Sequence, residues 1–116
     1  MGIPRANRLR RNTDFQRVRA WGRSWADRSL VLGVLSSDQG RVRVGITVSR
    51  RIGGAVVRAR VRRLIREAVR PWLHEIRGGW DLVFIARTPL RSASFHDVDR
   101  TVAQLLRRAG LVTEIK

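Results

Sequence analysis

The chain is 116 residues long, contains no cysteine, and has a formal charge of +16 from 25 Lys and Arg residues against 9 Asp and Glu residues. This length is typical of one domain with its own core, and the lack of cysteine excludes a disulfide framework and a thiolate metal site. Self-repulsion of this size destabilises a compact chain, so the charge indicates a polyanionic partner. We find neither a signal peptide nor an apolar stretch that could span a bilayer, and therefore expect a cytoplasmic protein with no membrane partner.

The N-terminal region predicts one short helix. Residues 1–11 are basic and irregular. Thr13, with Gln16 three positions later, resembles a capping box, and Gly22 is a residue type that commonly ends a helix. The sequence therefore predicts a helix from about Thr13 to Trp21.

Three segments have the composition of β-strands. Residues 29–35 are apolar, and residues 41–48 alternate between apolar and polar side chains. Residues 36–40 have the composition of a turn, so we expect these two strands to pair as an antiparallel hairpin. Residues 80–87 are apolar on both faces, which predicts a strand in the interior of the sheet.

Two further helices follow from the spacing of apolar residues. The first covers roughly residues 55–76, and Pro71 should end or kink it near Arg70. The second covers about residues 94–109 and stops at Gly110. The resulting order is α-β-β-α-β-α, which predicts an α+β fold, a two-layer sandwich formed by the single domain 1–116.

The helix predicted from residue 55 has two very different sides. At 100° per residue, its apolar residues form one stripe and its arginines cover the opposite side. Glu67 is the only acidic residue between Arg50 and Arg70, whereas a merely solvated face mixes both signs of charge. We therefore expect this segment to bind the phosphates of a nucleic acid, through Arg50, Arg51, Arg58, Arg60, Arg62, Arg63, Arg66 and Arg70.

Catalytic and metal-binding patterns are missing from the sequence. His74 and His96 are the only histidines, and neither has a companion at metal-ligand spacing. We predict no catalytic residue and no metal ligand in the protein. Between Arg50 and Arg70 there is also no Asn, Gln or Ser to read DNA bases, which favours structured RNA. The sheet face beside the helix would hold a single strand, which would stack on Phe15 or a nearby tryptophan.

The central part of the chain resembles the signature of the bacterial ribonuclease P protein family. The family pattern has a Val-Gly-x-x-Val-Ser-Lys-Lys-x-Gly approach and then Arg-Asn-Arg-x-(Lys/Arg)-Arg-x-x-Arg-Glu on a helix. The matching residues here are Val44-Gly45-Ile46-Thr47-Val48-Ser49-Arg50-Arg51-Ile52-Gly53 and Arg58-Ala59-Arg60-Val61-Arg62-Arg63-Leu64-Ile65-Arg66-Glu67. The likeness continues in residues 9–15 and 82–87, and it covers nearly the whole chain.

The resemblance implies a subunit of the endoribonuclease that removes 5′ leaders from precursor tRNA. It implies ribonuclease P RNA and precursor tRNA as partners, with catalysis and the Mg²⁺ ions held mainly by the RNA subunit, and a protein that is a monomer in the holoenzyme. It also implies a left-handed β-α-β crossover through the basic helix, where general rules predict a right-handed one. The arginines of the helix would contact RNA, and the leader would lie in a cleft near Phe15, Arg19, Gly33 and Ala59.

Three of these cleft positions depart from the family pattern. Ala59 stands where the family has Asn, and Arg19 and Gly33 stand where aromatic residues are common. Arg19 would replace aromatic stacking with stacking of its guanidinium group on a base. Two alternatives are a ribosomal-type RNA-binding protein without a processing role and a DNA-binding protein that uses the same helix.

Overall fold

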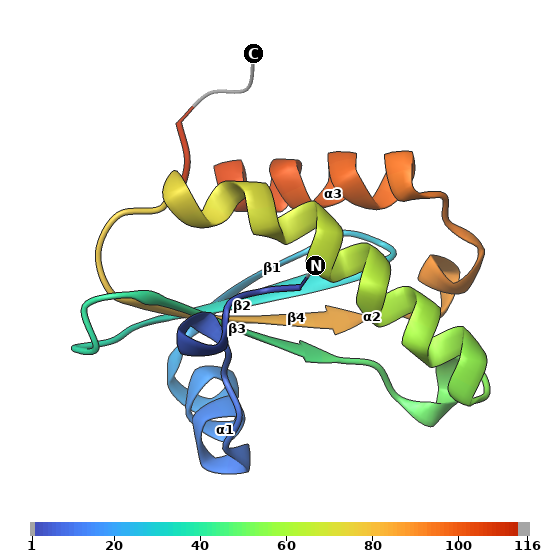
Figure 1. Ribbon diagram of the computed structural model, residues 1–116, viewed down its shortest axis with the longest axis horizontal. Helices are drawn as coiled ribbons and strands as arrows, with labels where there is room; N and C mark the ends of the chain where they lie inside the picture. The colour runs from blue at the N-terminus through green and yellow to red at the C-terminus, as the bar shows by residue number, and fades with distance from the viewer. Residues whose placement is uncertain (1, 114–116) are drawn as a thin grey trace.

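The computed structural model describes residues 2–113, which form a four-stranded sheet with helices on both faces (Figure 1). The α-helices are α1 (Asn12–Trp21), α2 (Ala55–Val69) and α3 (Phe95–Arg108). The strands are β1 (Arg23–Ala26), β2 (Leu30–Ser36), β3 (Val42–Thr47) and β4 (Trp80–Ala86). Short 3₁₀ helices are η1 (Arg5–Asn7), η2 (Arg50–Ile52), η3 (Arg70–His74) and η4 (Thr88–Ser92). The observed order is thus α-β-β-β-α-β-α, and the α+β class is confirmed.

The strand order in the sheet is β1-β2-β4-β3. β4 lies between β2 and β3, antiparallel to β2 and parallel to β3. The expected hairpin of residues 29–35 with residues 41–48 is therefore wrong, because β4 occupies the position between them. The interior placement of residues 80–87 is confirmed, and the apolar character of both faces of β4 explains it.

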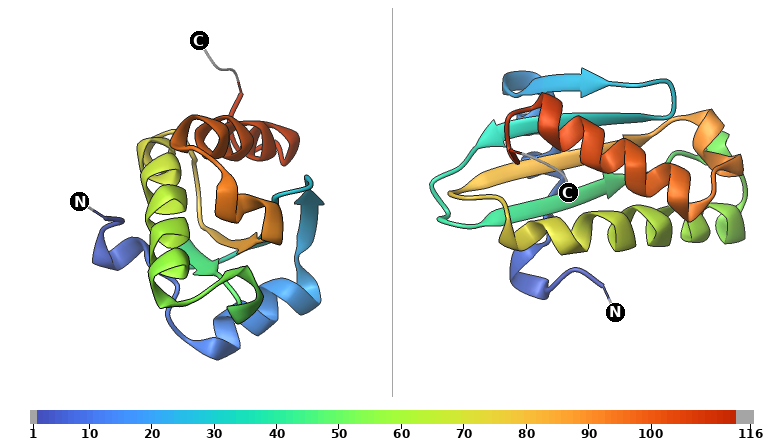
Figure 2. Two further views of the ribbon diagram at one scale, coloured as in Figure 1. Left: turned by 90° about the vertical axis from the view of Figure 1, so that its right-hand side faces the viewer. Right: turned by 90° about the horizontal axis from the view of Figure 1, so that it is seen from above.

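The β3–α2–β4 connection is left-handed. Viewed from the side of α2 with both strands pointing upward, β4 lies to the left of β3 (Figure 2, right). Parallel crossovers are right-handed in about 98% of cases. The handedness implied by the family resemblance is thus found in the structure.

Two apolar layers hold the helices on the sheet. α2 and α3 share one face, above a core that includes Leu32, Phe84 and Val102. α1 lies alone on the opposite face (Figure 1), where Val18 packs with Leu9 and Val83. The side chains of β2 and β4 alternate between these two layers.

The helix ends show which local predictions hold. α1 begins at Asn12 after Arg11, which makes no side-chain capping hydrogen bond, so the capping box predicted at Thr13 is wrong. α2 ends at Val69 and continues as the 3₁₀ helix η3, where Pro71 falls within the first two positions, which confirms the predicted break. α3 has a true capping box, formed by Ser94 and Asp97.

Candidate nucleic-acid interface

α2 separates its apolar residues from its arginines as the periodicity predicted. Its buried residues face the core, and all of its arginines are exposed or half-buried, as are Ala55, Val56, Val57, Ala59 and Glu67. Glu67 is the one acidic residue of the helix. Arg63, Arg66 and Arg70 are exposed, Arg58, Arg60 and Arg62 are half-buried, and Arg50 and Arg51 are exposed on η2 just before the helix.

Two of these arginines are bonded to the protein's own backbone. The Nε of Arg58 donates to the carbonyl of Gly53 at 3.1 Å. The Nη2 of Arg60 donates to the carbonyl of Ala93 at 2.9 Å, and its Nη1 donates to that of Arg91 at 3.3 Å. Arg60 therefore ties α2 to the segment before α3, and fewer of its N–H groups remain for a ligand.

A cleft of about 170 Å³ lies beside α2, on the side of the helix that carries Arg62 and Arg66. The N-terminal segment, α1, β3 and α2 all contribute to it, and among the described residues no carboxylate lines it. The cleft therefore combines an apolar floor with guanidinium groups on its rim. It is lined by Ile3, Arg8, Leu9, Phe15, Val44, Gly45, Ile46, Arg62 and Arg66.

Phe15 forms part of this cleft because β3 has a glycine beneath it. A Cβ atom built on Gly45 would lie 2.5 Å from two atoms of the Phe15 ring, so any other residue would displace the ring. Phe15 is half-buried, which leaves part of its ring accessible. Phe15, the aromatic residue predicted to contact a single strand, thus lines the same cleft as Arg62 and Arg66.

A second hollow of about 160 Å³ lies between α1 and the sheet. Arg19 and Gly33 both line it, with Val18, Gly22, Ser24, Val31, Val83 and Ile85. Gly33 lets α1 approach closely, since a Cβ there would lie 3.1 Å from a methyl group of Val18. Phe15 and Arg19 on α1 and Gly33 on β2 thus lie at the two hollows on one face of the sheet, whereas Ala59 is exposed on α2 and lines neither hollow.

An ion-pair cluster that we did not predict holds α1 near the sheet. Arg43 on β3 donates from Nε and Nη2 to the two carboxylate oxygens of Asp81 on β4, both at 2.8 Å. Asp14 on α1 lies 3.7 Å from the same guanidinium group. The hydrogen bond to Asp81, followed by the attraction of Asp81 and Asp14, raises the pKa of Arg43 above its ordinary value despite its burial. The one carboxylate within the apolar segment 80–87 was the available sequence signal.

The histidines and carboxylates of the described residues form no group of metal ligands. Among residues 2–113 no three His, Asp or Glu side chains lie close enough together to hold a metal ion, and His74 and His96 are both exposed. The helices within the same range are also too short or too polar to span a membrane.

The fold and the arginine-rich cleft define the class of this protein as a compact, basic RNA-binding domain. A family model described as ribonuclease P matches residues 3–110. The ribonuclease P protein component of Herpetosiphon aurantiacus is 44% identical over 109 residues, which are 94% of this chain and 89% of the relative. That of Roseiflexus castenholzii is 47% identical over 111 residues, or 95% of this chain and 91% of the relative.

Solved structures agree with these relatives. The ribonuclease P protein of Staphylococcus aureus has a TM-score of 0.87 and 30% identity, and the match covers 94% of this chain and all of that one. The Thermotoga maritima protein has a TM-score of 0.78 and 30% identity, and the match covers 87% of this chain and 96% of that one. The chain belongs to the ribonuclease P protein family and is the protein subunit of this tRNA-processing endoribonuclease.

Proposed function

We propose that this subunit binds ribonuclease P RNA through the exposed arginines of η2 and α2, and holds the 5′ leader of precursor tRNA in the cleft beside Phe15. The observation that carries the proposal is the position of Phe15, Arg62 and Arg66 in one cleft without a carboxylate among its described lining residues. Guanidinium groups match phosphate oxygens in charge and geometry, and an accessible aromatic ring accepts the face of any unpaired base.

The leader would run from Phe15 along α1 to Arg19. The hollow beside Arg19 has the apolar floor of Gly33, Val83 and Ile85, and the guanidinium of Arg19 can stack on a base or contact a phosphate. Ala59 would leave the exposed face of α2 without an amide that could anchor RNA. The RNA-binding set we propose comprises Arg50, Arg51, Arg58, Arg60, Arg62, Arg63, Arg66 and Arg70, with Arg60 also bracing α2.

Catalysis in this proposal belongs to the RNA subunit, as do the Mg²⁺ ions. The described part of the protein has no cluster of metal-ligating side chains, and the cleft is lined by cations, which repel a metal ion. Divalent ions would supply charge stabilisation and an activated water when bound by the RNA. The protein's own groups bind and orient the leader, and one protein copy acts in each particle.

Reconstitution tests this function. The chain is mixed with a bacterial ribonuclease P RNA and precursor tRNA at low Mg²⁺, and cleavage of the leader is followed with and without protein. We expect faster cleavage with the protein, because its positive charge offsets repulsion between the two RNAs. A lack of any gain would contradict the proposal and return the chain to the class of RNA-binding proteins without a processing role.

Variants of the cleft separate leader binding from general RNA binding. Phe15→Ala should weaken substrate binding about five- to 150-fold, the range equivalent to one lost aromatic–base stack of about 1–3 kcal/mol. Phe95→Ala is the matched control, because Phe95 is an exposed aromatic residue at the start of α3, away from the cleft. Competition of labelled structured RNA with duplex DNA at equal salt concentration tests the nucleic-acid class, and a preference for the duplex would contradict it.

A further inference from the structure

The four tryptophans of the chain gather at one end of the sheet, away from the proposed RNA-binding side of α2. Three of them line a groove of about 350 Å³ between the end of α1, the strands and the segment after α3. We call it the tryptophan groove and define it by Trp21, Trp25, Trp80, Arg23 and Leu111. Trp21 is 78% exposed, whereas tryptophan side chains are highly buried on average.

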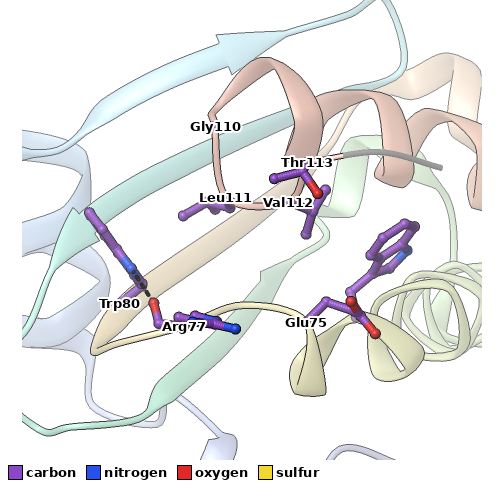
Figure 3. Close-up of a pocket in the computed structure, with 8 residues that line it drawn as sticks. Glu75, Arg77, Trp80, Gly110, Leu111, Val112 and Thr113 are labelled. Atoms are coloured by element: carbon purple, nitrogen blue, oxygen red, sulfur yellow. Dashed lines mark hydrogen bonds between the residues drawn. The ribbon is translucent and has the colours of Figure 1, made fainter.

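A second hollow adjoins this groove. It has a volume of about 480 Å³, and it shares Trp80, Gly110 and Leu111 with the tryptophan groove. The Nε1 of Trp80 donates to the carbonyl of Arg77 at 2.9 Å (Figure 3). The polar atom of this indole is therefore already bonded, and what Trp80 offers to a ligand is apolar ring surface.

The chemistry of the tryptophan groove suits an unpaired nucleobase. Arg23 is its one charged lining residue within the described chain, and its guanidinium carbon lies 5.3 Å from the centre of the Trp25 ring. Indole rings beside a guanidinium group are the parts from which single-stranded nucleic-acid sites are built, since the rings stack on bases and the cation contacts phosphate. A second copy of the chain is a poor occupant, because contact would bring together two molecules that each have a charge of +16.

The tryptophan groove also continues the path proposed for the leader. Gly22 lines both this groove and the hollow that contains Arg19. Phe15 and Trp21 lie six residues apart on α1, which is about 9 Å along a helix. The two side chains are also about 120° apart around the helix, and Trp21 is about 160° from Arg19. A single strand that stacks on Phe15 and passes Arg19 therefore reaches Trp21 by turning around the end of α1 at Gly22, which lines both hollows.

We propose that the tryptophan groove binds unpaired bases of the 5′ leader, upstream of those that lie over Phe15, with Trp21 as the stacking platform. This proposal rests on the proposed function of the cleft. It assigns the protein two aromatic contacts on one strand, one in the first turn of α1 and one at its last residue. The second contact is available only to leaders long enough to pass Arg19.

The test measures substrate affinity of the reconstituted holoenzyme for precursor tRNAs whose leaders are shortened one nucleotide at a time. With the unmodified protein, affinity should fall at two leader lengths, first when bases leave Trp21 and then when bases leave Phe15. Trp21→Ala should abolish the first step, a loss of about five- to 150-fold for long leaders, and leave short leaders unchanged. Trp21→Phe should restore most of the step, because a smaller aromatic ring still stacks.

Several outcomes would overturn the proposal. Equal losses for short and long leaders, or no loss at all with Trp21→Ala, would show that the leader does not reach the tryptophan groove. Weaker binding to ribonuclease P RNA without substrate would assign the groove to the RNA subunit instead. Because Trp21 is exposed, the variant should fold, and Phe95→Ala controls for loss of an exposed aromatic residue.

The same series distinguishes this inference from the proposed function. If Phe15→Ala weakens binding of short leaders and Trp21→Ala changes nothing, the cleft proposal stands and the groove proposal fails. If Phe15→Ala has no effect at any leader length, the proposed function of the cleft fails first. A drop in indole fluorescence on adding a single-stranded leader RNA, lost in Trp21→Phe, provides a readout independent of cleavage.

Discussion

Arg43→Met should strongly destabilise the protein, because it leaves a buried carboxylate without its cation. The side chain of Asp81 is 1% exposed and that of Arg43 is 15% exposed. Both oxygens of Asp81 accept hydrogen bonds from Arg43 at 2.8 Å. Methionine fills much of the same volume as the arginine stem, so the change removes the charge and the hydrogen bonds with little loss of packing.

The expected loss of stability is about 3–5 kcal/mol, the range for breaking a buried ion pair by removing one partner. For a chain of this size, each kcal/mol lowers Tm by about 4 °C. Thermal unfolding followed by circular dichroism should therefore show a Tm that is about 12–20 °C lower. The anchor of α1 is weakened at the same time, since Asp14 lies 3.7 Å from the same guanidinium group.

A double variant tests the reasoning behind this value. Arg43→Met combined with Asp81→Leu removes both charges, and replacing a buried pair with apolar residues is often neutral. We expect the double variant to recover most of the lost stability. A single variant that loses less than about 1 kcal/mol would refute the argument, since that is the range of an exposed pair. Arg17→Ala is the control, because Arg17 pairs with Asp14 at the surface.

Three further predictions concern the cleft and the start of α3. Gly45→Ala should displace the Phe15 ring, since the new Cβ would lie 2.5 Å from it, and leader affinity of the holoenzyme should fall towards that of Phe15→Ala. Arg62→Ala with Arg66→Ala should weaken RNA binding and reduce the slope of log affinity against log salt by roughly 1.4–1.8, because two phosphates are no longer neutralised. The pKa of Asp97 is lowered by hydrogen bonds at the helix start, so Asp97→Asn should lower Tm at neutral pH, and this difference should vanish as the pH falls through that pKa.

Each of these predictions has its own control. Gly40→Ala changes a glycine in the β2–β3 loop with nothing within 4 Å of the new Cβ, and it should leave leader affinity unchanged despite some backbone strain at its positive φ. Arg100→Ala with Arg107→Ala removes two exposed arginines from α3, so an equal change in salt slope there would show that α2 has no special role. A Tm difference for Asp97→Asn that persists at low pH would show that the carboxylate's charge is not its source.

The elements of this fold are readable from the sequence where periodicity is strong. The apolar stripe of α2 and the alternation of β3 depend on local spacing, and both were predicted within a few residues. β1 was missed, because four residues that include Arg23 and Ser24 have too little apolar alternation to stand out. The false hairpin has a different cause. The chain does turn between β2 and β3, at residues 38 and 39, but strand pairing is decided by burial, and β4 buries more apolar surface between β2 and β3 than at an edge.

The site was predictable in its charges and not in its shape. The arginines of α2 follow from the sequence, and Phe15 was assigned to the leader through the family resemblance. The packing of Phe15 on Gly45 depends on how α1 crosses β3, which sequence spacing does not report. The grouping of Trp21 and Trp80 likewise arises from the ends of α1 and β4 meeting, although these residues are far apart in the chain.

The position of β4 affects the order in which the protein can be made and folded. β4 is the last strand to be synthesised, yet both β2 and β3 pair with it. Until residue 86 has left the ribosome, β2 lacks one neighbour, β3 lacks its pairing strand, and Asp81 is not yet present for Arg43. Domains with such non-local pairing fold late and as one unit. The arginines of α2 are thus synthesised before the strand that completes the sheet beneath that helix.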